Sequence, residues 1–145
     1  MKKSILILFT IVIIIVTIMF VKYYSYKIEY NNVLKENAEY EEYKDQEIYG
    51  IELGTLINKT IDKNVKNKIE KDDNQVFIPN EENSIQIEIY MQDNELTYKM
   101  ETIYNAGMDQ FIQYYGNIKF KCSKIEYHKN TGKVKYLFFE QKATS

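Results

Sequence analysis

The side chains most able to do chemistry in this 145-residue chain are its single histidine, His128, and its single cysteine, Cys122. A cysteine nucleophile would need a base and an orienting acid beside it in space. His128 lies beside Asn130 in a stretch with the composition of a hairpin turn, where we expect a solvated histidine. Cys122 alternates with Ile118 and Phe120 on an expected strand, which favours a small buried hydrophobic residue over a reactive thiolate. The sequence therefore predicts no catalytic residue and no enzyme.

Metal and cofactor sites are not indicated either. One histidine and one cysteine cannot complete a structural zinc site made of nitrogen and sulfur ligands. The acidic pairs Asp72-Asp73 and Glu81-Glu82 do not follow the ligand spacing of a calcium-binding loop, so we expect solvated turns. The five glycines are scattered, without the glycine-rich loop that binds phosphate groups. We expect no metal and no cofactor.

Fourteen tyrosines and no tryptophan are the unusual feature of the composition. Tyrosine gives a large contact area at low entropic cost, which suits a binding surface, and Tyr24, Tyr49, Tyr90 and Tyr114 are expected to be exposed at least in part. The codon bias of an AT-rich genome explains the count equally well, because all 19 basic residues are lysine. Both interpretations remain open.

Charge bounds the class of partner. Beyond the two lysines at positions 2 and 3, the chain carries 17 of its 19 lysines and all 21 of its acidic residues. A mildly acidic surface without arginine argues against nucleic acid, whose binding sites are basic. We therefore expect no nucleic-acid partner.

The element that must position these side chains is an uncharged apolar run over residues 4–21. Eighteen such residues can cross the hydrocarbon core as a helix, the form that pairs every backbone group internally. Three of the next five residues are tyrosines, as is common at a lipid–water interface. Lys2 and Lys3 favour a cytoplasmic N-terminus with the rest of the chain outside. A cleaved signal peptide is the alternative, although no small-residue cleavage site follows Val21.

A polar segment, residues 22–47, follows the apolar run. It carries a stripe of residues that recur alternately three and four positions apart. This is the spacing of a heptad seam, and neither Gly nor Pro interrupts one long helix from about 4 to 47. In one interpretation the segment is a self-associating stalk whose register is set by Asn37. In the other, which we favour, the stripe packs against its own domain. This possible interaction seam comprises Tyr23, Tyr26, Tyr30, Val33, Asn37 and Tyr40.

Apolar residues at helical spacing predict two helices after the stalk, over about 51–66 and 102–115. Gly50 and Gly54 are expected to mark a bend before the first of them. Gly116 stands where a glycine commonly ends a helix.

Alternation of apolar and polar residues predicts the strands. A short strand is expected at 75–78 and a hairpin over 84–100. A second hairpin closes the chain, with a bulge near Ser123-Lys124 and Gly132 in the left-handed conformation at its turn. The fold class is then α+β, an antiparallel sheet with helices on one face. The expected domains are a transmembrane signal-anchor (1–21), a helical stalk (22–47) and an extracytoplasmic domain (48–145).

Two stretches, Ile48–Asn58 and Phe120–His128, resemble small single-pass membrane proteins of unassigned function in low-GC Gram-positive bacteria. That resemblance implies a membrane anchor and no particular activity. The layout of apolar helix, amphipathic continuation and sheet also loosely resembles type IV pilin-like subunits. The chain departs from the pilin pattern, since no Gly precedes the apolar run as a processing site and no Glu lies near its start.

We expect a non-enzymatic, extracytoplasmic interaction or assembly component of the cell envelope. One membrane span would hold it in the cell membrane, with the N-terminus in the cytoplasm. Its partners would be the membrane and either another copy of itself or another envelope protein. A pilin-like subunit of a filament or secretion apparatus is the alternative, and an enzyme is the third possibility.

Overall fold

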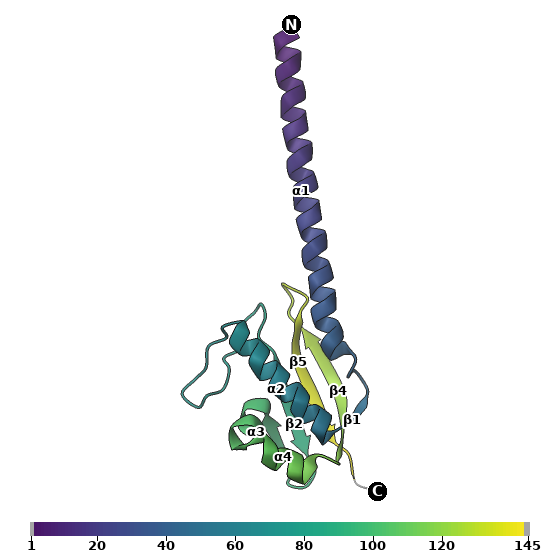
Figure 1. Ribbon diagram of the computed structural model, residues 1–145, viewed down its shortest axis with the longest axis vertical. Coiled ribbons are helices and arrows are strands. Elements are labelled where there is room, and N and C mark those ends of the chain that lie inside the picture. The colour runs from purple at the N-terminus through teal and green to yellow at the C-terminus, as the bar shows by residue number, and fades with distance from the viewer. Residues whose placement is uncertain (1, 144–145) are drawn as a thin grey trace. The chain divides into compact units, whose positions relative to one another are not determined.

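The computed structural model describes residues 2–143 (Figure 1). The chain forms two compact units, one ending at Lys35 and one beginning at Glu36. Helix α1 (Lys2–Glu41) makes up the first unit and contributes the first six residues of the second. The helix ends before the predicted position 47, because residues 42–45 form a turn in which Asp45 has a φ of 59°, and residues 47–49 form a strand. The remaining elements all belong to the second unit.

The first unit presents its apolar side chains outward. The large hydrophobic side chains from Ile5 to Val21 are 48–67% exposed. The hydroxyls of Thr10 and Thr17 donate to carbonyl oxygens four residues earlier, at 2.9 and 2.8 Å, so neither is left unpaired. In residues 2–143 this is the one helix long and apolar enough to cross a membrane, and no protein covers its apolar window.

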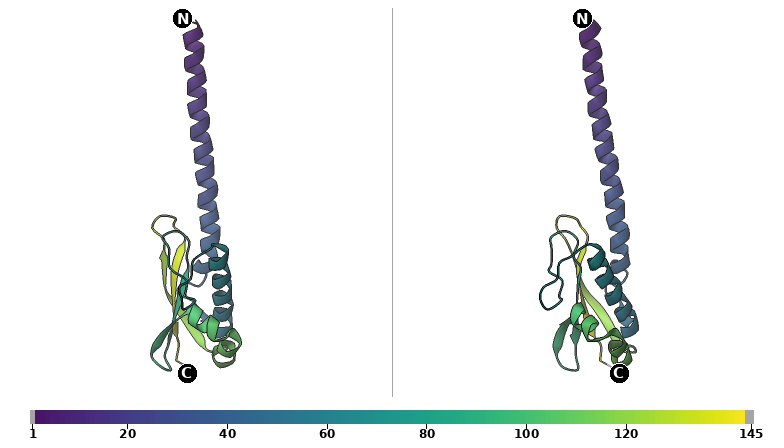
Figure 2. Two further views of the ribbon diagram at one scale, coloured as in Figure 1. Left: turned by 90° about the vertical axis from the view of Figure 1, so that its left-hand side faces the viewer. Right: turned by 60° about the vertical axis from the view of Figure 1, so that its left-hand side comes forward.

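The second unit is an α+β domain built on a five-stranded mixed sheet in the order β1-β4-β5-β2-β3. Helices lie on one face of this sheet (Figure 2). The predicted α+β class is confirmed. The strands are β1 (Glu47–Tyr49), β2 (Gln86–Met91), β3 (Leu96–Lys99), β4 (Lys119–Tyr127) and β5 (Val134–Gln141).

One pairing corrects the prediction of a purely antiparallel sheet, since β2 and β5 run parallel. The two predicted hairpins, β2–β3 and β4–β5, are both antiparallel. The second hairpin places β5 between β4 and β2, in the same direction as β2. Alternation shows which residues share a face but not which strands are neighbours, so this pairing was not predictable from the pattern.

The helices of the second unit follow the predicted spacing with two corrections. Helix α2 (Gly50–Lys66) includes Gly54 instead of bending there. A Cβ at Gly54 would lie 3.0 Å from the Met108 Cε, so glycine permits a close approach to the neighbouring helix. The predicted helix 102–115 is two helices, α3 (Met100–Ala106) and α4 (Met108–Tyr115). They are separated by Gly107, whose φ of 113° strongly favours glycine.

The predicted bulge and the predicted left-handed glycine of the second hairpin are confirmed, and the predicted strand at 75–78 is wrong. The register of β4 and β5 shifts between Cys122 and Lys124, and Gly132 adopts a φ of 69°. Residues 75–78 form only an isolated bridge, between Lys71 and Phe77. The nearby carboxylate of Asp72 accepts two backbone N–H groups, and this compact turn leaves no run of residues free for a ladder.

The core lies between the helices and the sheet. Cys122 is 0% exposed in this core, as predicted, and burial raises the pKa of its thiol to about 11. An inert buried thiol follows from both observations. The largest side chains buried with it are Tyr40, Leu53, Leu56, Ile57, Phe77, Ile87, Ile89, Met100, Phe120, Leu137 and Phe139.

Candidate functional site

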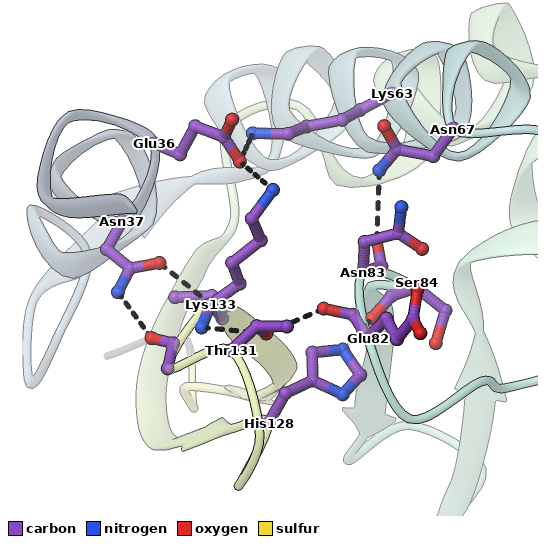
Figure 3. Close-up of polar contacts among 12 residues, drawn as sticks. Glu36, Asn37, Lys63, Asn67, Glu82, Asn83, Ser84, His128, Thr131 and Lys133 are labelled. Carbon is purple, nitrogen blue, oxygen red and sulfur yellow. Dashed lines mark hydrogen bonds and ion pairs between the residues drawn. The ribbon is translucent and has the colours of Figure 1, made fainter. Parts of the chain in front are cut away.

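His128 is buried, which corrects the prediction of a solvated turn residue. Its side chain is 2% exposed, and its Nε2 lies 2.8 Å from the carbonyl oxygen of Ser84. A carbonyl oxygen only accepts, so Nε2 carries the proton and donates. The loop around Ser84 and the β4–β5 hairpin hold the imidazole between them (Figure 3). Local composition indicated a turn but contained no signal for a second loop packed over it.

Cys122 and His128 do not form a catalytic pair. The Cys122 thiol contacts the carbonyl oxygen of Lys124 at 3.7 Å, whereas the His128 ring contacts Ser84. In the part of the chain that the structure describes, no group of three or more His, Cys, Asp or Glu side chains is placed to hold a metal ion. The arrangement of His128 is that of a structural residue that joins two segments.

Two buried asparagines pair with backbone at the starts of the two central parallel strands. The Asn37 amide donates to the Gly132 carbonyl at 2.8 Å and accepts the N–H of Val134, at the start of β5, at 2.9 Å. The Asn64 amide makes the same pair of bonds with Ile85, just before β2, at 2.7 and 2.9 Å. Each side-chain amide thus donates one hydrogen bond and accepts one, as the backbone of a neighbouring strand would.

Ion pairs and hydrogen bonds surround Asn37 (Figure 3). The Glu36 carboxylate lies 3.6 Å from the Lys63 ammonium and 3.3 Å from that of Lys133. The Thr131 hydroxyl donates to the carbonyl oxygen of Glu82 at 2.7 Å. The cluster joins the end of α1, helix α2, the loop at 80–84 and the β4–β5 hairpin. Because its charges are partly exposed, each ion pair contributes little, and the cluster is a structural junction.

The structure divides the possible interaction seam into two parts. Asn37 and Tyr40 are buried within the second unit at 6% and 1% exposure, as packing against the chain's own domain requires. Tyr23, Tyr26 and Tyr30 are 63%, 67% and 53% exposed, and Val33 is half-buried. Both polar ends of the Asn37 amide are used by the hairpin, so they are not free to meet a second copy. Self-association through the exposed tyrosines stays a prediction.

A pocket of about 230 Å³ lies between the β2–β3 hairpin and the helices α3 and α4. Its floor is apolar core, because three of its lining side chains are only 3–7% exposed. Tyr114 is 72% exposed, and Thr102 and Gln110 are exposed polar lining residues. The break at Gly107 separates the two helices that line it. The main lining side chains are Met91, Tyr98, Ile103, Phe111, Tyr114 and Tyr115.

Aromatic packing and a single nearby carboxylate set the character of this pocket. The ring centroids of Phe111 and Tyr115 are 5.5 Å apart, and Phe120 packs against both rings at 6.1 and 6.5 Å. Burial, followed by the charge of Asp93 and by Tyr98, raises the pKa of Tyr115 above its ordinary value. The lining itself carries no charged side chain. Such a pocket can hold an apolar group and offer hydrogen bonds at its rim.

Sequence reasoning did not find this pocket. It identified Tyr114 only as one of the exposed tyrosines, which is correct, as it is for Tyr24 at 58% and Tyr49 at 48% exposure, while Tyr90 is half-buried. The separate helices α3 and α4 were predicted as one. One straight helix over these residues does not predict a concave surface. Gly107 was the sequence signal that the helix is broken there.

Comparisons with known proteins add no relative. No family model, no curated protein and no solved structure matches the chain. The resemblances to small single-pass membrane proteins of Gram-positive bacteria and to pilin-like subunits therefore stay predictions. The candidate site is defined by the geometry of the pocket between α3, α4 and the β2–β3 hairpin.

Proposed function

We propose that the chain is a single-pass membrane protein whose second unit lies outside the cell membrane as an interaction or assembly component of the envelope. The observation that carries the proposal is the uncovered apolar helix. Fifteen large hydrophobic side chains between Ile5 and Val21 are about half to two-thirds exposed. At about 1.5 kcal/mol or more for each side chain, leaving them in water costs on the order of 20 kcal/mol. A bilayer removes that cost.

The orientation follows from charge. Lys2 and Lys3 precede the apolar segment, and positively charged flanks are retained in the cytoplasm. Lys2, Lys3 and the amino terminus give three positive charges before the apolar segment, against Lys22 and Lys27 after it, so the cytoplasmic bias is an excess of one charge. The second unit would then face outward, where partners in the envelope can reach it.

A binding role is supported by the aromatic pocket. Its lining combines buried apolar side chains with an exposed tyrosine and two polar rim residues, the composition of a recognition site. The buried Cys122 thiol and the His128 Nε2 each contact a backbone carbonyl oxygen, whereas the His128 Nδ1 has no partner among the described residues. The proposal is therefore a binding module on a membrane anchor, without catalysis.

The test is protease protection on intact protoplasts that express the chain with an epitope tag at each end. Externally added protease should remove the C-terminal tag and leave the N-terminal tag intact. Persistence of the C-terminal tag until the protoplasts are lysed would refute the outward orientation. The mass of the membrane-bound protein distinguishes an uncleaved signal-anchor from a cleaved signal peptide, because cleavage would shorten the chain by about its apolar run.

A pilin-like subunit is the second candidate, and the uninterrupted helix α1, Lys2–Glu41, favours it. In that case the helix would leave the bilayer and pack in a filament. Mechanical shearing of cells should then release the chain into a high-molecular-mass fraction. Retention of the whole population in the membrane would exclude this candidate and leave the anchored binding module.

A further inference from the structure

We propose that the pocket and the neighbouring edge strand β3 together bind an extended peptide segment of another envelope protein, with one aliphatic or aromatic side chain inserted in the pocket. The inference rests on the proposed function, because it names the class of partner for that interaction. Tyr98 joins the two features, since it belongs to β3 and also lines the pocket. A peptide lying along the strand would therefore pass the pocket mouth.

Strand β3 has a free edge. β3 is the last strand of the sheet, and within residues 2–143 no strand pairs with its outer side. Every second residue of an edge strand directs its N–H and C=O away from its partner. Edge strands are commonly protected by being short, by proline or by charges; β3 has four residues, no proline and one charged residue, Lys99. Added strands use such edges, and adjacent pockets select their side chains.

The pocket has the size of one side chain. Its volume of about 230 Å³ is below the roughly 300–1,000 Å³ of pockets for drug-sized ligands. It exceeds the cavity of about 150 Å³ that is known to hold a benzene molecule. One phenylalanine, leucine or similar side chain matches this range. Met91, Ile103 and Phe111 supply an apolar floor for it.

The charges around β3 favour a basic partner. Asp93 and Glu95 lie in the β2–β3 turn at one end of the strand, and Lys99 lies at its other end. The carboxylate of Asp93 accepts a hydrogen bond from the Gln141 side chain at 3.1 Å, and after burial its charge is the next cause that raises the pKa of the pocket side chain Tyr115. Two carboxylates against one ammonium leave the edge with an excess negative charge. The partner segment should therefore carry basic residues beside its apolar anchor.

The probe is a synthetic heptapeptide, Lys-Thr-Thr-Phe-Thr-Thr-Lys, with a dye at its N-terminus and an amide at its C-terminus. It is titrated against the full chain in lipid nanodiscs, and binding is followed by fluorescence anisotropy. Replacing Phe by Ala should weaken binding at least tenfold. Replacing both Lys residues by Glu should weaken it about threefold. Binding of the Ala and Glu peptides as tight as that of the probe would overturn the proposal.

Backbone pairing is tested with N-methylated probes. One probe carries an N-methyl group on Phe, and the other carries it on the following Thr. In an added strand only alternate N–H groups face the protein. One of the two peptides should therefore lose at least tenfold in affinity while the other binds nearly as the parent does. Equal binding of both would overturn strand addition and assign the pocket to a free apolar molecule.

The matched protein variants are Thr102→Trp, which fills the pocket mouth, and Thr55→Trp, which adds the same ring elsewhere on an exposed helix position. Thr102→Trp should weaken the probe at least tenfold, and Thr55→Trp should leave it unchanged. If Thr102→Trp lowers the unfolding midpoint, Gln110→Lys takes its place and should weaken the Lys-flanked probe by charge repulsion. Equal binding of the probe to the pocket variant and to the control would overturn the assignment of this pocket as the peptide-binding site.

If the saturable signal comes from association of two copies and Thr102→Trp abolishes it, the partner at this site is a second copy of this chain and the peptide proposal is overturned. Peptide binding and the outward orientation can fail independently of each other. Peptide binding is measured in nanodiscs and does not depend on orientation in the cell. A protected C-terminal tag in protoplasts would refute the outward orientation while the peptide result stands.

Discussion

Asn64→Ala should destabilise the second unit strongly, because Asn64 is the only partner of the backbone at Ile85 seen in the described residues. The amide is fully buried, and its two bonds to Ile85 measure 2.7 and 2.9 Å. Ile85 is itself 3% exposed, so its N–H and C=O would lose their partners without gaining water. Each unpaired buried group costs about 1–3 kcal/mol, which gives about 2–6 kcal/mol for the pair. That is a large part of the roughly 5–15 kcal/mol that holds a domain folded.

Asn58→Ala is the matched control. Asn58 lies on the exposed face of the same helix, α2, so both substitutions raise helix propensity by the same amount. Urea unfolding of the full chain in micelles, followed by the near-ultraviolet circular dichroism of the tyrosines, gives both free energies of unfolding. We expect Asn64→Ala to be less stable than Asn58→Ala by at least about 2 kcal/mol. Hydrogen exchange at the Ile85 amide should accelerate in the same variant. A difference below about 1 kcal/mol would refute the role of the asparagine as a substitute strand.

Three further predictions concern the thiol, a buried tyrosine and the exposed part of the seam. Cys122 should react with maleimide at neutral pH at least a hundredfold more slowly in the folded protein than in urea, and rapid native labelling would show an accessible thiolate. Burial raises the pKa of Tyr40 to about 12, so its contribution to stability is complete below about pH 10 and is lost as pH rises toward 12. Tyr40→Phe should therefore raise the midpoint of alkaline unfolding, and an unchanged midpoint would show that this proton is not involved. In a Cys122→Ala background, Val33→Cys should form disulfide-linked dimers in membranes and Lys35→Cys should not, and equal yields would remove the case for a specific stalk interface.

The periodic segments were predictable because each carries its own local signal. The apolar run within Lys2–Glu41 was predictable from its length and its lack of charge, and the helix Gly50–Lys66 from the helical spacing of its apolar face. The bulge at Cys122/Lys124 was predictable because the parity of apolar residues changes there. The left-handed Gly132 followed from turn chemistry.

The other features depend on contacts between distant segments. The parallel pairing of β2 with β5 joins residues about fifty positions apart, such as Ile87 and Leu137. The burial of His128 depends on a loop 44 residues earlier in the chain. The pocket depends on how the Gly107 break turns α4 against the β2–β3 hairpin. No window of neighbouring residues contains this information.

The central claim is that the apolar helix crosses the membrane and places the second unit outside. A direct measurement is labelling of single cysteines by a membrane-impermeant maleimide in intact cells, using Tyr114→Cys and Ser4→Cys in a Cys122→Ala background, which keeps Lys2 and Lys3. Tyr114 is 72% exposed, so a cysteine there is open to reagent wherever the domain lies. The account predicts rapid labelling at position 114 and labelling at position 4 only after lysis. Labelling at position 4 in intact cells, or at position 114 only after lysis, would contradict it.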